Sequence, residues 1–349
     1  MKQFSLAVLF ATLLSGAIAC QPSPSTDESS SPASNELPGE GITVKPIQTN
    51  VREEYFSAEI VRIALEKLGY EVAEPEEVAT PPILYTVLAN GDVDYTTMNW
   101  EKIHTKFYEK SGGDEKLAKM GVLIGDALQG YQVDKKTAEE HNITSLEQLK
   151  DPEIAKLFDS DRDGKADLAG CPPGWGCELV VEHHLDAYDL RDTVEHNQGM
   201  YGLLIADTIT RYKQGESVLF YTWTPMWVGQ VLKPDRDTIW LEVPYTALPE
   251  EQGEVSEEET TVDGKNLGFA PERIRITANK KFITANPAAK KLFESIAIPI
   301  EDMNAQNFRI REGEDSMEDI TRHAEEWIAQ NQELFDGWIE EALQVESEN

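Results

Sequence analysis

The sequence predicts an α/β fold, and three observations lead to that prediction. Short runs rich in β-branched and aromatic residues alternate with segments whose apolar residues recur every three or four positions, a pattern typical of strands alternating with helices. Glycine closes several of the helical segments, at Gly69, Gly91 and Gly215. With 349 residues, the chain is long enough for two globular units. Alternation of this kind favours mainly parallel sheets.

The elements expected in the first half follow this alternation. Phe56, Ile60 and Leu68 share one helical face, and Gly69 follows in the usual place for a left-handed residue. In chain order we expect a strand at Ile42–Val44, a helix over Phe56–Leu68, a strand at Tyr70–Val72, a short helix over Ile83–Leu88 and a strand at Val93–Met98.

The second half repeats the pattern and ends in helices. We expect a helix over Leu203–Tyr212, strands at Val218–Tyr221 and Ile274–Thr277, and a helix over Pro287–Ile296 with Asn286 as its N-cap. Two C-terminal helices follow, one carrying Met317, Ile320, Ala324, Trp327 and Ile328 on one face, the other carrying Leu334, Phe335, Trp338 and Ile339. Trp327 and Trp338 are therefore expected in the core. The acidic segment 250–263 lacks apolar periodicity and is expected to be a solvated loop.

Residues 1–19 are expected to be a secretory signal peptide. An uncharged, mostly apolar stretch from Phe4 to Ala19 follows a single basic residue and ends at Cys20. A Cys after the cleavage site resembles a bacterial lipobox, although Ala17 stands where Leu is usual. Residues 20–40 are rich in Ser and Pro, which is typical of a flexible stalk. We therefore predict a lipid-modified Cys20, and the alternative is a soluble secreted protein in which Cys20 is incidental.

The net charge excludes one class of partner. With 31 Lys and Arg against 64 Asp and Glu, the chain carries a formal charge of −33. Nucleic acid is not an expected partner, because a phosphate backbone needs a basic face. The same charge argues against docking on anionic lipid. Contact with a membrane is therefore expected through the lipid anchor alone.

The two remaining cysteines form an even pair. Cys171 and Cys177 are six positions apart, a spacing that suits a short-loop disulfide in an oxidising compartment. The stabilisation expected for so small a loop is roughly 2 kcal/mol. Fixing the shape of the intervening loop is therefore the better reason for a bridge, and two reduced core cysteines are the alternative.

Three tryptophans lie outside the apolar stripes. Trp100, Trp175 and Trp223 each follow an expected strand or lie in a turn, and in open α/β sheets ligands bind beyond the carboxyl ends of the strands. Indoles that converge there attract a quaternary ammonium group. A helix expected to begin near Cys177 adds the N–H groups of Gly176 and Cys177, which bind a carboxylate without a cationic side chain. A cation box beside a carboxylate cradle describes a betaine site.

These residues resemble the glycine betaine/proline-betaine substrate-binding protein of an osmoprotectant ABC importer, the ProX type. The resemblance covers roughly residues 41–345, and its Trp-Gly-Cys loop is highly specific. The matching motifs are Gly41–Val44, Ala64–Tyr70, Asn99-Trp100, Gln129–Tyr131, Asp163–Leu168, Gly174–Glu178, His196–Gly199 and Tyr221–Pro225.

The resemblance implies a two-lobed periplasmic-binding-protein fold, type II-like, with the ligand in the interlobe cleft. Lobe I would comprise residues 41–128 and 246–349, including the helical C-terminus, and lobe II residues 129–245. By motif, the expected roles are an aromatic box for Trp100, Trp175 and Trp223, carboxylate binding for His104 and the amides of Gly176 and Cys177, and a disulfide for Cys171 and Cys177. The lipobox and acidic stalk depart from the soluble periplasmic members.

The acidic loop that precedes this region carries a separate pattern. Asp159, Asp161, Asp163 and Asp167 occupy positions one, three, five and nine of an EF-hand-type loop, with a glycine at position six. Gly170 stands at position twelve, where a bidentate Glu belongs, so the pattern is incomplete. Two hypotheses follow: a structural calcium ion, or a turn held by Asp side chains. No other cofactor is expected.

The sequence therefore predicts an extracytoplasmic substrate-binding lipoprotein, in the periplasm or at the cell surface. It would capture glycine betaine or proline betaine and deliver it to an ABC importer permease with its ATPase. Choline and carnitine are alternative ligands. One rival is a metal-assisted hydrolase using His183 or His184, which lack a His-Glu-x-x-His motif. The other is a calcium-dependent surface module. We expect no catalysis.

Overall fold

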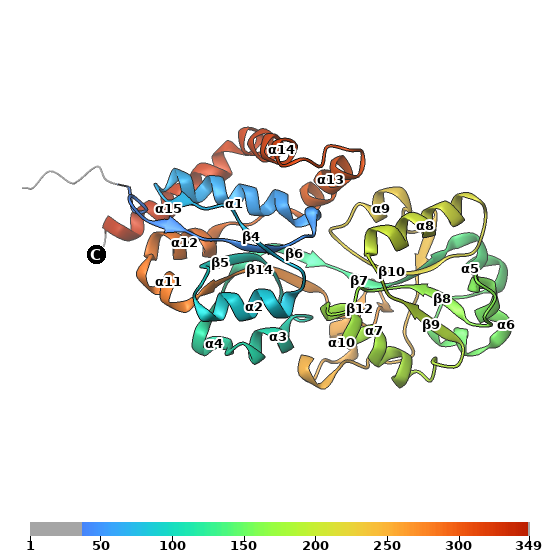
Figure 1. Cartoon of the computed structure of the whole chain (residues 1–349). Coiled ribbons are helices and arrows are strands. Elements are labelled where there is room, and N and C mark those ends of the chain that lie inside the picture. Colours follow the sequence, from blue (N-terminus) through green and yellow to red (C-terminus); the bar gives the residue numbers. More distant parts are fainter. Residues whose placement is uncertain (1–36, 348–349) are drawn as a thin grey trace, which may run out of the picture. The chain divides into compact units, whose positions relative to one another are not determined.

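Two larger β-sheets organise the computed structural model, which describes residues 37–347. The first sheet has three strands in the order β5-β14-β6, and the second has five strands in the order β11-β7-β10-β8-β9. Figure 1 shows the elements around each sheet, which we call lobe I and lobe II. The expected signal peptide, Cys20 and most of the stalk lie outside the described residues.

The sheet of lobe I is antiparallel at its centre. Strand β14 (Glu272–Asn279) runs between β5 (Tyr95–Trp100) and β6 (Leu117–Ala127), antiparallel to both. Two short pairs of strands in this lobe are parallel: β1 (Thr43–Val44) with β3 (Glu71–Val72), and β2 (Ile47–Thr49) with β4 (Glu76–Val78). The prediction of mainly parallel sheets is therefore wrong for lobe I. The reason is that β6 leads out of this lobe and β14 leads back into it, so the two run in opposite directions.

Helices cover both faces of this sheet. Helix α1 buries Phe56, Ile60 and Ala64 as the periodicity predicts, and Gly69 after it has a φ of +90°. The Trp327 indole packs against Trp338 at a centroid distance of 6.1 Å, and both are buried as expected. In chain order the helices are η1 (Arg52–Glu54), α1 (Tyr55–Lys67), α2 (Pro81–Asn90), α3 (Thr105–Lys110), α4 (Gly113–Lys116), α11 (Lys280–Ala285), α12 (Pro287–Ser295), α13 (Ile300–Arg311), α14 (Met317–Gln330) and α15 (Gln332–Ser347).

Three details of the predicted helices differ in the structure. Met317 and Leu334 were expected to share a face with the core tryptophans but are 45% and 44% exposed. Each lies in the first turn of its helix, where periodicity continues but fewer neighbours surround the side chain. Asn286 precedes α12 without a side-chain capping bond, and its Nδ2 donates instead to the carbonyl oxygen of Phe282 in α11.

Lobe II is built around a mixed sheet. Strand β10 (Leu219–Trp223) is antiparallel to β7 (Gln129–Asp134) and parallel to β8 (Ala166–Ala169), which pairs in parallel with β9 (Val194–Asn197). Strand β11 (Thr238–Trp240) completes the other edge. The helices of this lobe are α5 (Lys135–His141), η2 (Leu146–Lys150), α6 (Pro152–Ala155), η3 (Lys156–Phe158), α7 (Gly176–Ala187), α8 (Tyr201–Lys213) and α9 (Val228–Val231).

The chain passes between the two sheets twice. The first passage is at Leu128, between β6 and β7. The second follows Asn266, because the Val243 N–H donates to the carbonyl oxygen of Asn266 and so holds the intervening segment to lobe II. This segment contains η4 (Glu250–Gln252), α10 (Glu257–Thr260), β12 (Thr261–Val262) and β13 (Lys265–Asn266).

Segment 250–263 was expected to be a solvated loop, and part of it is ordered by local hydrogen bonds. Ser256 and Glu259 form a capping box, in which the serine hydroxyl accepts from the Glu259 N–H and the Glu259 carboxylate accepts from the Ser256 N–H. Reciprocal capping of this kind favours the short helix α10 despite its three exposed glutamates. Within residues 37–347, the helices are too short or too polar to cross a membrane.

Candidate ligand-binding site

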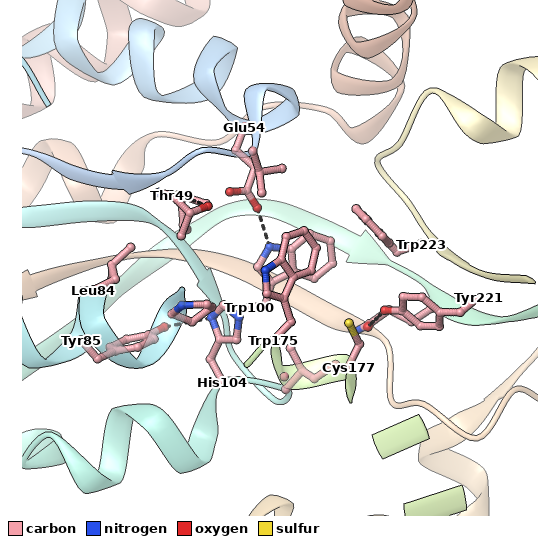
Figure 2. Close-up of a pocket in the computed structure, with 16 residues that line it drawn as sticks. Thr49, Glu54, Leu84, Tyr85, Trp100, His104, Trp175, Cys177, Tyr221 and Trp223 are labelled. Atoms are coloured by element: carbon pink, nitrogen blue, oxygen red, sulfur yellow. Dashed lines mark hydrogen bonds between the residues drawn. The ribbon is translucent and has the colours of Figure 1, made fainter. Parts of the chain in front are cut away.

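A cavity of about 60 Å³ lies where lobe I and lobe II face each other. Since a water molecule needs about 10–15 Å³ of such volume, this space suits a small solute. All six residues predicted to bind the ligand line the cavity: Trp100, His104, Trp175, Gly176, Cys177 and Trp223. The first two come from lobe I and the other four from lobe II, and Figure 2 shows all of them except Gly176 with labels.

Trp100 ends strand β5 and is held by a carboxylate. Its Nε1 atom donates a hydrogen bond of 2.8 Å to Oε1 of Glu54, which ends the short helix η1. Figure 2 shows this bond at the upper wall of the cavity. An indole whose edge is fixed in this way has little freedom to turn. One ring face therefore stays available to the cavity, where a cation is attracted by its electrons.

The other two indoles come from lobe II and contact each other. Trp175 and Trp223 have ring centroids 6.0 Å apart at an interplanar angle of 64°. Tyr201 supports Trp223 from behind at a centroid distance of 4.4 Å, and its hydroxyl donates to the Tyr221 carbonyl oxygen. Tyr221 also lines the cavity. The edge-to-face arrangement presents aromatic surface from two directions, as a box for a tetrahedral cation requires.

The N-terminus of α7 points uncapped N–H groups toward the same cavity. Gly176 and Cys177 are the first two residues of this helix, and no side chain caps it at Trp175. The first N–H groups of a helix have no acceptor within the helix, and the helix dipole adds partial positive charge there. This end of the cavity can therefore accept a carboxylate without any Lys or Arg.

His104 lies at the other side of this carboxylate position as a buried, neutral ring. Its Nδ1 is 3.3 Å from the hydroxyl of Tyr85, which donates to Asn99 Oδ1. Burial lowers the pKa of His104 to about 3, against the opposing effect of a hydrogen bond with the Met98 backbone. A neutral imidazole keeps one N–H group, so His104 can add a directed hydrogen bond but no charge.

The chain also matches a known family over most of its length. Residues 42–330 match the family described as the substrate binding domain of ABC-type glycine betaine transport system. The chain belongs to this family.

Curated relatives support the assignment over nearly the full length. The chain is 52% identical over 310 residues to the glycine betaine-binding periplasmic protein OusX of Dickeya dadantii, covering 89% of this chain and 92% of the relative. It is 50% identical over 308 residues to the glycine betaine/proline betaine-binding periplasmic protein of Escherichia coli, covering 88% and 92%. The family is one of transport proteins that bind a substrate.

Solved structures share the fold. The glycine betaine/L-proline-binding protein ProX from Borrelia burgdorferi has a TM-score of 0.65 at 21% identity, covering 85% of this chain and 96% of that one. Lactococcal OpuAC, closed on glycine betaine, has a TM-score of 0.64 at 20% identity, covering 85% and 99%. These similarities confirm the predicted two-lobed periplasmic-binding-protein fold.

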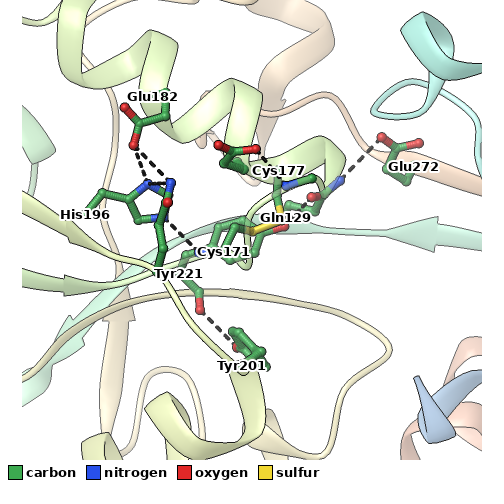
Figure 3. Close-up of a disulfide and its surroundings, with 11 residues drawn as sticks. Gln129, Cys171, Cys177, Glu182, His196, Tyr201, Tyr221 and Glu272 are labelled. Atoms are coloured by element: carbon green, nitrogen blue, oxygen red, sulfur yellow. Dashed lines mark hydrogen bonds and ion pairs between the residues drawn. A yellow bond between two sulfur atoms is a disulfide. The ribbon is translucent and has the colours of Figure 1, made fainter. Parts of the chain in front are cut away.

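The loop that carries Trp175 is closed by a disulfide. Cys171 and Cys177 are bonded, with their Cα atoms 6.0 Å apart, so the predicted pairing is confirmed. Figure 3 shows the bond next to His196, whose Nε2 accepts from the Cys171 N–H at 2.8 Å and whose Nδ1 contacts Glu182 at 2.7 Å. The bridge and the histidine therefore fix both ends of the family's Trp-Gly-Cys loop.

A series of side-chain hydrogen bonds joins lobe I to lobe II beside the cavity. Glu272 of lobe I accepts from the N–H groups of Lys102 and Ile103 and, at 3.3 Å, from Nε2 of Gln129 in lobe II. The Oε1 atom of Gln129 accepts in turn from the Tyr221 hydroxyl (Figure 3). Burial raises the pKa of Glu272 to about 7 against these hydrogen bonds. These hydrogen bonds link β14 to two residues that line the cavity, Gln129 and Tyr221.

Sequence reasoning missed four of the residues around the ligand position. Gln129 and Tyr221 belong to motifs that carried the family resemblance but received no role there, and Tyr85 was counted only as part of a helix. Glu54 was missed because an acidic residue just before a helix is commonplace near a helix N-terminus. Only the tertiary fold shows that these side chains face the cavity.

The Asp-rich loop lies in lobe II, and its carboxylates already have partners. Asp159, Asp161 and Asp167 bring ligand atoms within 4.8 Å of one another. Asp159 accepts from the N–H groups of Arg162 and Gly164, and Asp167 accepts from Ser160. Asp163 instead groups with Asp161 and Glu195. The predicted four-residue set is therefore divided between two clusters, and the calcium hypothesis stays a prediction.

The two histidines of the alternative hydrolase hypothesis do not line the cavity. His184 is fully buried, and its Nδ1 is 2.8 Å from the Tyr131 hydroxyl. Burial lowers its pKa to about 3. His183 is not among the described clusters of metal-ligating side chains. Trp227 donates from Nε1 to Glu53 at 2.9 Å, and the Trp240 ring lies beside Gly130, where an added Cβ atom would come within 3.2 Å of it.

Proposed function

We propose that this protein captures glycine betaine and proline betaine outside the cytoplasm and delivers them to an ABC importer. The observation that carries the proposal is the cavity itself, which is lined both by three indoles and by an uncapped helix N-terminus. A betaine has a quaternary ammonium at one end and a carboxylate at the other. The indoles can thus bind the ammonium end, and the helix N-terminus can bind the carboxylate end.

The proposed roles of the residues follow from their positions. Trp100, Trp175 and Trp223 surround the trimethylammonium, and the N–H groups of Gly176 and Cys177 hold the carboxylate together with His104. No bond of the ligand breaks on binding. Because the ligand touches both lobes, it favours the closed arrangement by its differential affinity for the two states.

The carboxylate cradle separates the betaines from the alternative ligand choline. Choline has the same trimethylammonium group but a hydroxyl in place of the carboxylate, so the N–H groups of Gly176 and Cys177 would lack a charged acceptor. Hydrogen bonds to a charged group contribute about 1.5–3 kcal/mol each. We therefore expect choline to bind at least tenfold more weakly than glycine betaine.

Calorimetric titration tests the proposal. Glycine betaine, proline betaine, choline and carnitine are titrated into the full mature chain, together with an unrelated amino acid as control. The proposal expects saturable binding of the two betaines with one ligand per chain. Absence of binding for every quaternary ammonium compound contradicts it.

Anchoring and partners complete the proposal. A lipid on Cys20 and a stalk over residues 20–40 would keep the protein at the membrane, next to the permease and its ATPase. The extracytoplasmic location is supported by the periplasmic relatives and by the disulfide between Cys171 and Cys177, a bond that persists in oxidising compartments. A structural calcium ion at the Asp-rich loop would be independent of ligand capture.

A further inference from the structure

Glu54 places a carboxylate in the wall of the cavity with one oxygen unused. Its Oε1 accepts from Trp100, while Oε2 is shut off from solvent and has no hydrogen-bond partner in the described structure. Figure 2 shows the carboxylate beside the indole at the top of the cavity. Buried polar groups are nearly always hydrogen-bonded. A buried oxygen without a partner therefore indicates that Glu54 has a role in binding the ligand.

No cationic side chain among the described residues that line this cavity neutralises Glu54. The other residues of η1 are Arg52, whose Nη1 donates to the Asp315 carbonyl oxygen, and Glu53, which accepts from Nε1 of Trp227 at 2.9 Å. On α13 the guanidinium of Arg311 lies over the Trp227 ring, and on α1 Glu59 pairs with Arg62. A buried carboxylate without a counter-ion is strongly unfavourable as an anion.

The free protein therefore holds Glu54 in its protonated form near neutral pH. Burial raises the pKa of Glu54 to about 8, assisted by the negative charge of Glu53 and opposed by the Trp100 hydrogen bond. Two other groups around the cavity do not titrate between pH 6 and 9. Burial lowers the pKa of His104 to about 3 and raises that of Tyr85 well above its usual range.

We propose that Glu54 is the counter-ion of the ligand's ammonium group and releases its proton to solvent when the ligand enters. This inference rests on the proposed function. The O–H bond of Glu54 breaks, the proton passes to buffer, and the carboxylate faces the cation that the indoles enclose. Near neutral pH, the aromatic box would thereby gain a full negative charge only while it is occupied.

Proton release makes the affinity depend on pH with a definite sign. Below about pH 8 the free site is protonated and must lose a proton to bind, so the affinity falls as the pH falls. One proton per ligand gives up to tenfold per pH unit. Above about pH 8 the free site is already ionised, so the affinity is constant there. The ligand's own carboxylate titrates far below this range.

The test compares the parent chain with Glu54→Gln. Glutamine keeps an acceptor for the Trp100 N–H but cannot ionise. Glycine betaine is titrated from pH 6 to pH 9, and at pH 7 in two buffers of different ionisation enthalpy to count protons. We expect the parent to bind at least tenfold more weakly at pH 6 than at pH 8 and to release a proton at pH 7. Glu54→Gln should show neither effect. Its affinity for glycine betaine should equal that of the parent only near pH 6.

Two matched variants separate Glu54 from its acidic neighbours. Glu53→Gln has the same change one residue away and should keep the pH dependence, shifted slightly toward lower pH because one nearby negative charge is removed. Glu272→Gln removes the other carboxyl group whose pKa, raised by burial to about 7, lies in this range, and should also keep it. Circular dichroism and melting temperature establish that each variant is folded.

The outcomes distinguish this inference from the proposed function. A parent that binds glycine betaine with the same affinity from pH 6 to pH 8 overturns the role of Glu54 and leaves the function intact. The same conclusion follows if folded Glu54→Gln keeps the parent's pH dependence. A parent that binds no quaternary ammonium compound overturns both.

Discussion

Gly176 of lobe II lies so close to Ile103 of lobe I that a Cβ atom on the glycine would come within 2.6 Å of the Ile103 carbonyl oxygen. Both residues line the cavity, and the contact joins the two lobes directly beside the proposed carboxylate position. A backbone oxygen cannot turn away as a flexible side chain can. The missing side chain of Gly176 therefore allows the lobes to approach this closely.

We predict that Gly176→Ala weakens glycine betaine binding by at least tenfold. The methyl group would clash only when the lobes are closed, so the melting temperature of the ligand-free protein should change little, and calorimetry with thermal unfolding measures the two effects. Gly202→Ala is the matched control, since a Cβ there meets no atom within 4 Å. Unchanged affinity in Gly176→Ala would show that closure does not depend on this contact.

The local features of the fold were predictable because neighbouring residues determine them. The helical face of Phe56 and Ile60 and the left-handed Gly69 were expected from spacing alone, and the structure has them. The antiparallel position of β14 was not predictable in this way. It depends on the chain leaving lobe I at Leu128 and returning at Glu272, a relationship between residues far apart in the sequence.

The residues of the candidate site also differ in whether local sequence could predict them. Residues in a distinctive motif, such as Trp175 beside Cys177, could be assigned a role from the sequence. Glu54 could not, because its importance comes from its distance to Trp100 and from the absence of any described cation in the cavity wall. Local sequence carries no information on either.

We predict that Cys20 carries lipid at the mature N-terminus. A cysteine at the end of an apolar signal-like stretch and before a Ser- and Pro-rich segment is typical of exported lipoproteins. Mass spectrometry of protein purified from its native membrane measures the modification. Cys20→Ser should move the protein to the soluble fraction, because Ala17 and Ala19 still suit the ordinary signal peptidase. An unmodified, soluble parent would rule lipidation out.

The calcium hypothesis for the Asp-rich loop predicts stabilisation by mass action. If the carboxylates of Asp159, Asp161 and Asp167 bind calcium, millimolar calcium should raise the melting temperature relative to chelator. Asp161→Ala should abolish the gain, whereas Asp207→Ala, at an exposed position of α8, should not. Equal melting temperatures of the parent in calcium and in chelator would leave the loop as a turn held by Asp side chains.

The aromatic box leads to the most direct prediction about the ligand. A trimethylammonium spreads its charge over methyl groups, so it is recognised by ring faces and shape. A desolvated cation–π contact contributes about 2 kcal/mol, and about 1.4 kcal/mol corresponds to a factor of ten. We therefore expect Trp100→Ala, Trp175→Ala and Trp223→Ala each to weaken glycine betaine binding more than tenfold in calorimetry, with the fold retained.

Trp327→Ala is the control that separates binding from stability. Trp327 is 8% exposed, packs against Trp338 and donates from Nε1 to Asp302. Removing a buried indole commonly costs 3–5 kcal/mol, so this variant should melt at lower temperature and bind with the parent's affinity. Dimethylglycine should bind more weakly than glycine betaine to the parent, because its remaining N–H has no acceptor on a ring face. Parent-like binding by all three box variants would show that the indoles do not recognise the cation.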